Sequence, residues 1–158
     1  EVLLTLPVQE KEVVLGKFIA SFLFLLVMIA LTFNIPLLVG LLGDPDWGMI
    51  ICGYLGCLLM GASYLAIGPF ASGLSDNQII AFILAIAICT AMLIVGEWFF
   101  LILVPDLFVP LFNYLGLGTH FESMGRGVID TRDLLYYLSV IGIFLYLNVN
   151  AVENRTWV

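Results

Sequence analysis

The sequence contains few charged residues, and few of those are basic. Only 11% of its 158 residues are Asp, Glu, Lys or Arg, whereas 63% are hydrophobic. A water-soluble domain typically has about 25% charged residues, so this chain has too few to cover a surface that faces water. The five basic residues are scattered and the net charge is −7, which excludes nucleic acid as a partner because phosphate binding requires clustered Lys and Arg.

Residues that carry catalysis or bind metals are equally scarce. His120 is the single histidine, and Cys52, Cys57 and Cys89 lie in apolar runs without forming a Cys-x-x-Cys pair. Such cysteines are typical of small buried side chains rather than of metal ligands or a disulfide. The sequence also lacks a zinc-protease, a serine-hydrolase and a Gly-x-x-x-x-Gly-Lys-Ser/Thr phosphate-loop motif. We therefore expect neither an enzyme nor a cofactor or metal site in this chain.

Long apolar runs make up most of what is present. About 20 apolar residues at about 1.5 Å each cross the hydrocarbon core of a bilayer, and about four runs reach that length. We predict an all-α polytopic transmembrane helical bundle that forms one domain, residues 1–158. The predicted spans are residues 18–42, 49–70, 78–103 and 134–152.

Local signals predict how these spans bend, pack and end. Pro36 should kink the first span, and Asn34 beside it can bond the carbonyl groups that the kink releases. Gly68-Pro69 should end the second span, and Ser75 should cap the third with Gln78 in a capping box. Small residues that recur in the second span predict close helix packing; they are Gly53, Gly56 and Gly61.

Residues 104–133 fit neither a span nor an ordinary loop, and we term them the outer segment. Two prolines interrupt the segment, yet it is too apolar for water, so we predict a re-entrant or interfacial helical region. Thr119 and Glu122 form a second capping box, Gly125 and Gly127 should close the helix that it begins, and Asp130 or Thr131 should cap the last span.

Charged groups near the membrane are candidates for chemistry. His120, Glu122, Arg126 and Asp130 gather in the outer segment and could bind a metal or act as acid and base in an intramembrane enzyme. Caps and interfacial charges explain the same residues more simply. Glu97 lies near the far end of the third span and is followed by aromatic residues, so an interfacial position and a functional role are both possible interpretations.

The first 17 residues combine an apolar turn with a polar run, and they precede the first span directly. A short amphipathic helix of this kind could anchor the chain to the membrane or dock a soluble partner. Lys11, Lys17 and Arg155 outnumber Arg126 and Arg132, so the positive-inside rule places both ends in the cytoplasm.

Several motifs are similar to those of one transporter family. The opening run, with Leu6-Pro7-Val8, a polar stretch and Leu15-Gly16-Lys17, resembles the cytoplasmic coupling element of permease subunits of type-2 ATP-binding-cassette (ABC) transporters. Further motifs resemble the group that includes gliding-motility and copper-enzyme-maturation permeases. They are Asn77-Gln78, His120 to Ser123, Arg126 to Asp130, and Asp133 to Tyr137.

The resemblance implies an exporter subunit of a bacterial plasma (inner) membrane, surrounded by lipid and paired with a second permease subunit. A separate ABC ATPase would hold ATP and Mg²⁺, and the outer segment would close the exit side. The family usually has about six spans, so two further spans are expected before the coupling element at residues 1–17. The residues expected to couple to the ATPase are Leu4, Leu6, Pro7, Glu10, Lys11 and Glu12. A structural membrane subunit of a larger machine, such as a motility apparatus, is the alternative, and the cargo is not identified.

Overall fold

The computed structural model describes residues 10–75 and 77–156, and within these ranges the chain is helical with no strands. The predicted all-α bundle is therefore confirmed. Its helices are α1 (Glu10–Thr32), α2 (Asn34–Leu42), α3 (Trp47–Gly73), α4 (Gln78–Ile94), α5 (Trp98–Leu101), α6 (Val109–Leu115), α7 (Leu117–Gly125) and α8 (Thr131–Thr156).

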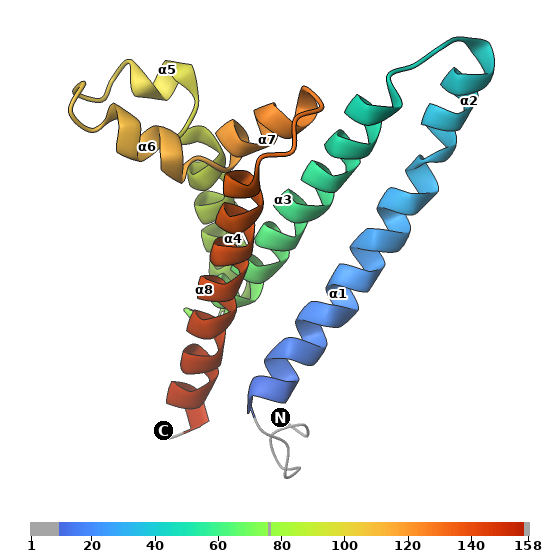
Figure 1. Ribbon diagram of the computed structural model, residues 1–158. Helices are drawn as coiled ribbons and strands as arrows, with labels where there is room; N and C mark the ends of the chain where they lie inside the picture. Colours follow the sequence, from blue (N-terminus) through green and yellow to red (C-terminus); the bar gives the residue numbers. More distant parts are fainter. Residues whose placement is uncertain (1–9, 76, 157–158) are drawn as a thin grey trace.

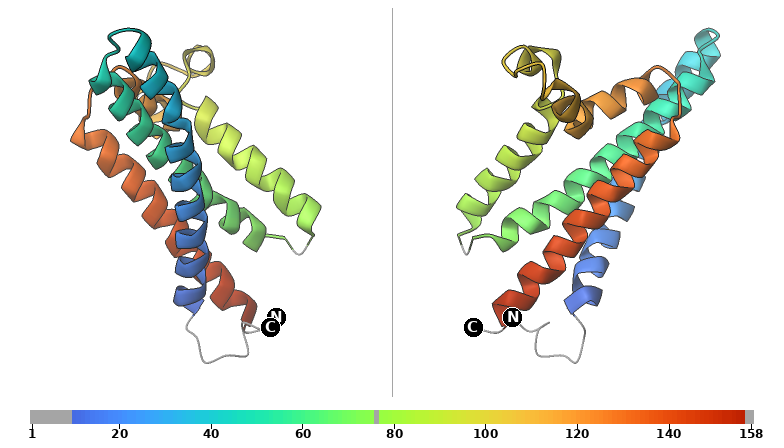
Figure 2. Two further views of the ribbon diagram at one scale, coloured as in Figure 1. Left: turned by 90° about the vertical axis from the view of Figure 1, so that its right-hand side faces the viewer. Right: turned by 60° about the vertical axis from the view of Figure 1, so that its left-hand side comes forward.

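The long helices run alternately up and down, and the short ones gather at one end (Figure 1). Helices α5, α6 and α7 lie at the upper end, whereas α1 begins and α8 ends at the lower end, which we term the base. Helix α3 is central because it contacts α1, α4, α7 and α8. Figure 2 shows α3 and α8 side by side over much of their length.

Three helical stretches are long and apolar enough to cross a membrane, as expected of an integral membrane protein: Lys11–Leu42, Trp47–Gly73 and Thr131–Glu153. Helix α4 is apolar but has only 17 residues, which corresponds to about 25 Å and falls short of a bilayer core of about 30 Å. The predicted continuous span 78–103 is therefore wrong beyond Ile94. The chain turns at Gly96 because its backbone there must pass close to another segment of the protein.

The predicted kink in the first span is confirmed, and its hydrogen bonds are made by side chains. Helix α1 ends at Thr32 and α2 begins at Asn34. Pro36 has no N–H, so the carbonyl of Thr32 loses its helical donor, and the hydroxyl of Tyr54 on α3 donates to it at 3.0 Å. The side-chain amide of Asn34 donates to the Leu31 carbonyl at 3.1 Å. Both carbonyl groups thus have side-chain donors, as a backbone in an apolar environment requires.

Helix α3 packs closely through small residues. A methyl group on Gly56 would lie 3.0 Å from the Phe121 ring, and one on Gly61 would lie 2.8 Å from Leu25. Gly53 has nothing within 4 Å, so the packing prediction is confirmed for the other two glycines only. Pro69 was expected to end the helix but lies inside it, because α3 continues for one further turn to Gly73.

The cap of α4 also differs from the prediction. Asn77 is the N-cap, and its side-chain oxygen accepts a hydrogen bond from the Ile79 N–H at 2.9 Å. The hydroxyl of Ser75 instead accepts from the Asn77 N–H at 3.2 Å and so supports the turn before the helix. The Ser75–Gln78 capping box is wrong because asparagine, itself a strong cap, stands one residue closer to the helix.

Candidate functional site

The outer segment is held to α4 by a close crossing of two glycines. A methyl group on Gly116 would lie 2.5 Å from the Gly96 Cα, and one on Gly96 would lie 2.9 Å from the Gly116 Cα. Real Cβ atoms essentially never approach other atoms to under 3.0 Å, so these backbones touch without room for any side chain. The crossing fixes the break between α6 and α7 against the end of α4.

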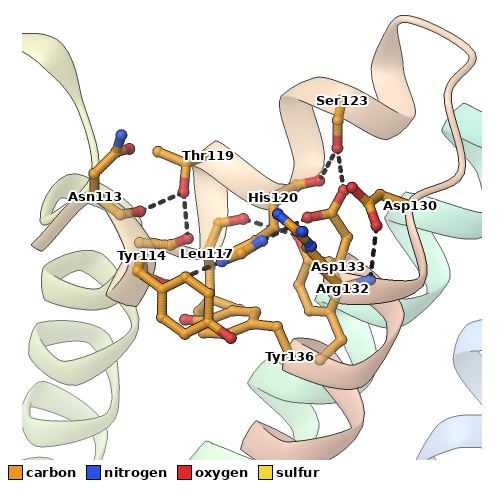
Figure 3. Close-up of polar contacts among 12 residues, drawn as sticks. Asn113, Tyr114, Leu117, Thr119, His120, Ser123, Asp130, Arg132, Asp133 and Tyr136 are labelled. Carbon is orange, nitrogen blue, oxygen red and sulfur yellow. Dashed lines mark hydrogen bonds and ion pairs between the residues drawn. The ribbon is translucent and has the colours of Figure 1, made fainter. Parts of the chain in front are cut away.

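Side chains bond the backbone carbonyl groups around this break, as Figure 3 shows for several of them. Thr119 donates through one hydroxyl shared between the carbonyls of Asn113 and Gly116, at 2.8 Å each. The remaining donors in this stretch are His120 to Tyr114, Tyr136 to Leu115, and Tyr137 to Leu117. Every carbonyl from residue 113 to 117 thus has a side-chain donor. An irregular backbone needs this inside an apolar environment, because unpaired carbonyl groups there cost several kcal/mol each.

His120 lies at the centre of a buried polar network (Figure 3). Its Nδ1 is 2.6 Å from Oδ1 of Asp133 on α8, and its Nε2 is 2.9 Å from the Tyr114 carbonyl oxygen. The other oxygen of Asp133 accepts a hydrogen bond from Ser123, and the ring of Tyr136 stacks on the imidazole with centroids 3.9 Å apart. His120 and Asp133 are each only 8% exposed. The network therefore joins α7 to α8 inside the protein.

This arrangement does not place a nucleophile beside a base. The serine hydroxyl bonds to the carboxylate rather than to the imidazole, and both ring nitrogens of His120 are already bonded. A general base needs a free nitrogen within reach of the proton that it removes. The network is therefore suited to holding structure.

The outer-segment candidates do not form one cluster. Glu122 pairs with Arg126 at 3.7 Å on a surface where both side chains are about 70% exposed, and Asp130 accepts from the Arg132 N–H at 2.9 Å. His120 bonds to Asp133 instead, so these residues were grouped wrongly. Within residues 10–75 and 77–156, no set of three or more His, Cys, Asp or Glu could hold a metal ion.

Of the predicted caps in this segment, two are confirmed and one is wrong. Asp130 opens α8, and α7 ends at Gly125, followed by Gly127 in the left-handed region at φ +83°. Thr119 does not cap with Glu122, because its hydroxyl donates to carbonyl groups and α7 begins two residues earlier, at Leu117.

Only some of the predicted coupling residues are described by the structure, and these lie at the base, the lower end of the molecule. Leu4, Leu6 and Pro7 lie outside the described residues, and Glu10 is the first residue of α1. Lys11 and Glu12 are exposed on the first turns of α1. A groove of about 400 Å³ runs between this turn and the end of α8; its lining includes Lys11, Val14, Tyr146, Asn150 and Glu153.

Comparison with protein-family models, with curated proteins and with solved structures finds no match for this chain. A functional assignment therefore depends on the sequence motifs and on the geometry of the outer segment and the base.

Sequence reasoning missed the residues that complete the polar network. Asp133, Ser123, Tyr136 and Tyr137 were not among the candidates, yet they bond His120 or the carbonyls beside it. One signal was present: an acid and two adjacent tyrosines open an otherwise apolar helix. Polar groups on the buried side of such a helix need partners, and the single histidine is one of the few nearby.

Proposed function

We propose that this chain is the permease subunit of an ATP-binding-cassette exporter, and that a separate ATPase subunit drives it. The observation that carries the proposal is the position of α1. This helix begins at Glu10, directly after the segment that resembles a coupling helix, and continues with α2 as one apolar stretch of 32 residues, Lys11–Leu42. A displacement of the coupling segment would therefore move a helix long enough to cross the whole membrane.

Helix α8 offers a second mechanical route from the base to the outer segment. It contacts α1, and the two line the groove at the base. At its other end it carries Asp133, Tyr136 and Tyr137, which bond the backbone or side chains of the outer segment. Movement of α8 would thus be passed to the outer segment through direct hydrogen bonds, in keeping with rigid-body switching between two states.

In this proposal the chain binds no nucleotide, because its sequence has no phosphate loop. The ATPase dimer would change shape on hydrolysis, and the coupling segment would carry that change into the membrane. The outer segment would open and close the exit side. Large apolar side chains left exposed on α1, such as Leu23 at 55% and Phe24 at 69%, are available to lipid or to a second permease subunit.

The experiment is co-purification of the ATPase with the full-length subunit. Replacing Leu4 and Leu6 with Asp should release the ATPase while the subunit stays in the membrane, because apolar anchors give a helix in a groove most of its affinity. The control is Lys11→Glu, a reversal at an exposed rim position, which should have a smaller and salt-dependent effect. An ATPase retained at wild-type level by the double variant would reduce the segment to a membrane anchor. The absence of any ATPase from the wild-type complex would favour the structural-subunit alternative.

A further inference from the structure

A hollow of about 690 Å³ opens between α7 and the turn that joins α4 to α5. Much of its lining is apolar, with Met60, Leu93 and Phe121 among the contributing side chains. Trp98 lines it too and is 72% exposed, which is typical of a tryptophan at the boundary between lipid and water. The hollow has the size and the apolar walls of a small-molecule site.

Glu97 supplies an unpaired negative charge on the wall of this hollow. Its side chain is half-buried and makes no hydrogen bond or ion pair with any residue that the structure describes. The carboxylate lies against Gly118, where a methyl group would be 2.9 Å from its Oε1. The glycine therefore makes room for the acid. An ionised carboxylate near the membrane is costly without a partner, so this site favours a cation.

A positive charge lies at the rim of the same hollow. Arg126 lines it, and the side chain is 69% exposed. Its ion pair with Glu122 spans 3.7 Å, and an ion pair at such exposure contributes little free energy. The guanidinium can therefore donate to another anion. The lining thus carries the unpaired carboxylate of Glu97 and the weakly paired Arg126 and Glu122, with apolar side chains around them.

We propose that this hollow binds the headgroup of an aminophospholipid. The ammonium group would bond to the Glu97 carboxylate, the phosphate would lie at Arg126, and the acyl chains would follow the apolar wall out to the surrounding lipid. Charge complementarity selects this occupant, because a headgroup with both signs matches the two side chains, whereas a purely anionic headgroup would meet Glu97 unpaired. The inference goes beyond the proposed function and holds whether or not the chain couples to an ATPase.

The test is native mass spectrometry of the full chain in mild detergent, titrated with dioleoyl phosphatidylethanolamine. One lipid should bind to each chain in preference to dioleoyl phosphatidylglycerol, which has no ammonium group. Glu97→Gln should weaken the first affinity about tenfold, since it removes one charge-assisted hydrogen bond, and it should not weaken the second. Equal affinity for the two lipids, or unchanged phosphatidylethanolamine binding by Glu97→Gln, would overturn the proposal.

Matched variants separate the site from general effects. Asp44→Asn removes an exposed carboxylate that does not line the hollow, and it should change the affinity less than twofold. Gly118→Ala keeps the charge but displaces the Glu97 carboxylate, so it should also weaken phosphatidylethanolamine binding. This variant tests the role of Glu97 if Glu97→Gln fails to fold. Free phosphoethanolamine should not compete at the lipid's concentration. If it competes equally, the ligand is a soluble zwitterion and the lipid assignment fails.

Discussion

The imidazole of His120 and the carboxylate of Asp133 lie 2.6 Å apart and join two helices across 13 residues of sequence. The carbonyl of Tyr114 can only accept, so Nε2 of the histidine carries a hydrogen. On the opposite side of the ring, Nδ1 and the Asp133 carboxylate form a second buried hydrogen bond. Each group therefore depends on the other, because removing either leaves a buried polar partner without its bond.

Asp133→Ala should lower the free energy of unfolding by about 3 kcal/mol, since it leaves the buried imidazole without its hydrogen-bond partner. His120→Ala should have a similar effect. Unfolding in mixed micelles with increasing SDS, followed by circular dichroism, would measure both values.

The double variant is the informative control for this pair. His120→Ala combined with Asp133→Ala should cost clearly less than the sum of the single changes, because neither orphaned group remains. Glu122→Ala breaks only the exposed pair with Arg126 and should change stability by less than about 0.5 kcal/mol. Additive single effects would show that the two side chains act independently.

Gly116→Ala, at the break between α6 and α7, should destabilise the protein more than alanine at a glycine inside a described helix. The added methyl group would meet the Gly96 backbone at 2.5 Å, and backbone cannot move aside as a flexible side chain can. We expect a loss of about 2–3 kcal/mol from this overpacking, measured in the same SDS titration. Gly142→Ala is the matched control because nothing lies within 4 Å of it, and it should be neutral or slightly stabilising. Equal effects of the two changes would contradict the crossing.

Much of the membrane architecture could be predicted from local sequence. The kink follows from Pro36 alone, since proline removes one helical hydrogen bond wherever it stands. The bond from Asn34 follows too, because an asparagine beside a kink can reach a carbonyl in the preceding turn. Close packing at Gly56 and Gly61 follows from residue size. The kink depends on residues close together in the chain, and the packing prediction needs only the glycines themselves, because small residues allow close approach by any partner.

The end of α4 could not be predicted in this way. Residues 98–103 remain apolar, and one glycine costs a helix only about 1 kcal/mol, so nothing local stops the helix at Ile94. The crossing with Gly116, twenty residues later, decides it. The partnership of His120 with Asp133 was missed for the same reason, since it spans a turn and joins two helices. Both features depend on tertiary contacts between separate segments, and local sequence patterns do not reveal which segments meet.

Tyr54→Phe should destabilise the protein by about 1 kcal/mol, because it removes the hydroxyl that bonds the Thr32 carbonyl at the kink. The loss should largely disappear in a Pro36→Ala background, where alanine restores an N–H four residues after Thr32 and the helix can bond that carbonyl itself. A double-mutant cycle in the SDS titration measures this coupling. Zero coupling between the two positions would mean that the tyrosine hydroxyl serves some other contact.

The alternating direction of the long helices predicts which turns share a side of the membrane. In a cysteine-free background, a membrane-impermeant maleimide should reach single cysteines at Asp44 and Arg126 only from outside, and at Ser75 only from inside. Asp44 and Arg126 are suitable because both are exposed, whereas the neighbouring Met124 is fully buried and would not react. Labelling of position 75 from outside would contradict the predicted orientation. If positions 44 and 126 were then labelled only from inside, the orientation would be the reverse.

The carbonyl groups of residues 113–117 depend on donors that are synthesised after them. Tyr136 and Tyr137 belong to α8, the last of the described helices to leave the ribosome. Until α8 is made, Leu115 and Leu117 lack these two side-chain partners, and only the glycine crossing and the bonds from Thr119 and His120 hold the break between α6 and α7. Among the described helices, the outer segment can therefore be completed only after α8 has been made. A nascent chain held short of Asp133 would present that segment to the insertion machinery in an unfinished form.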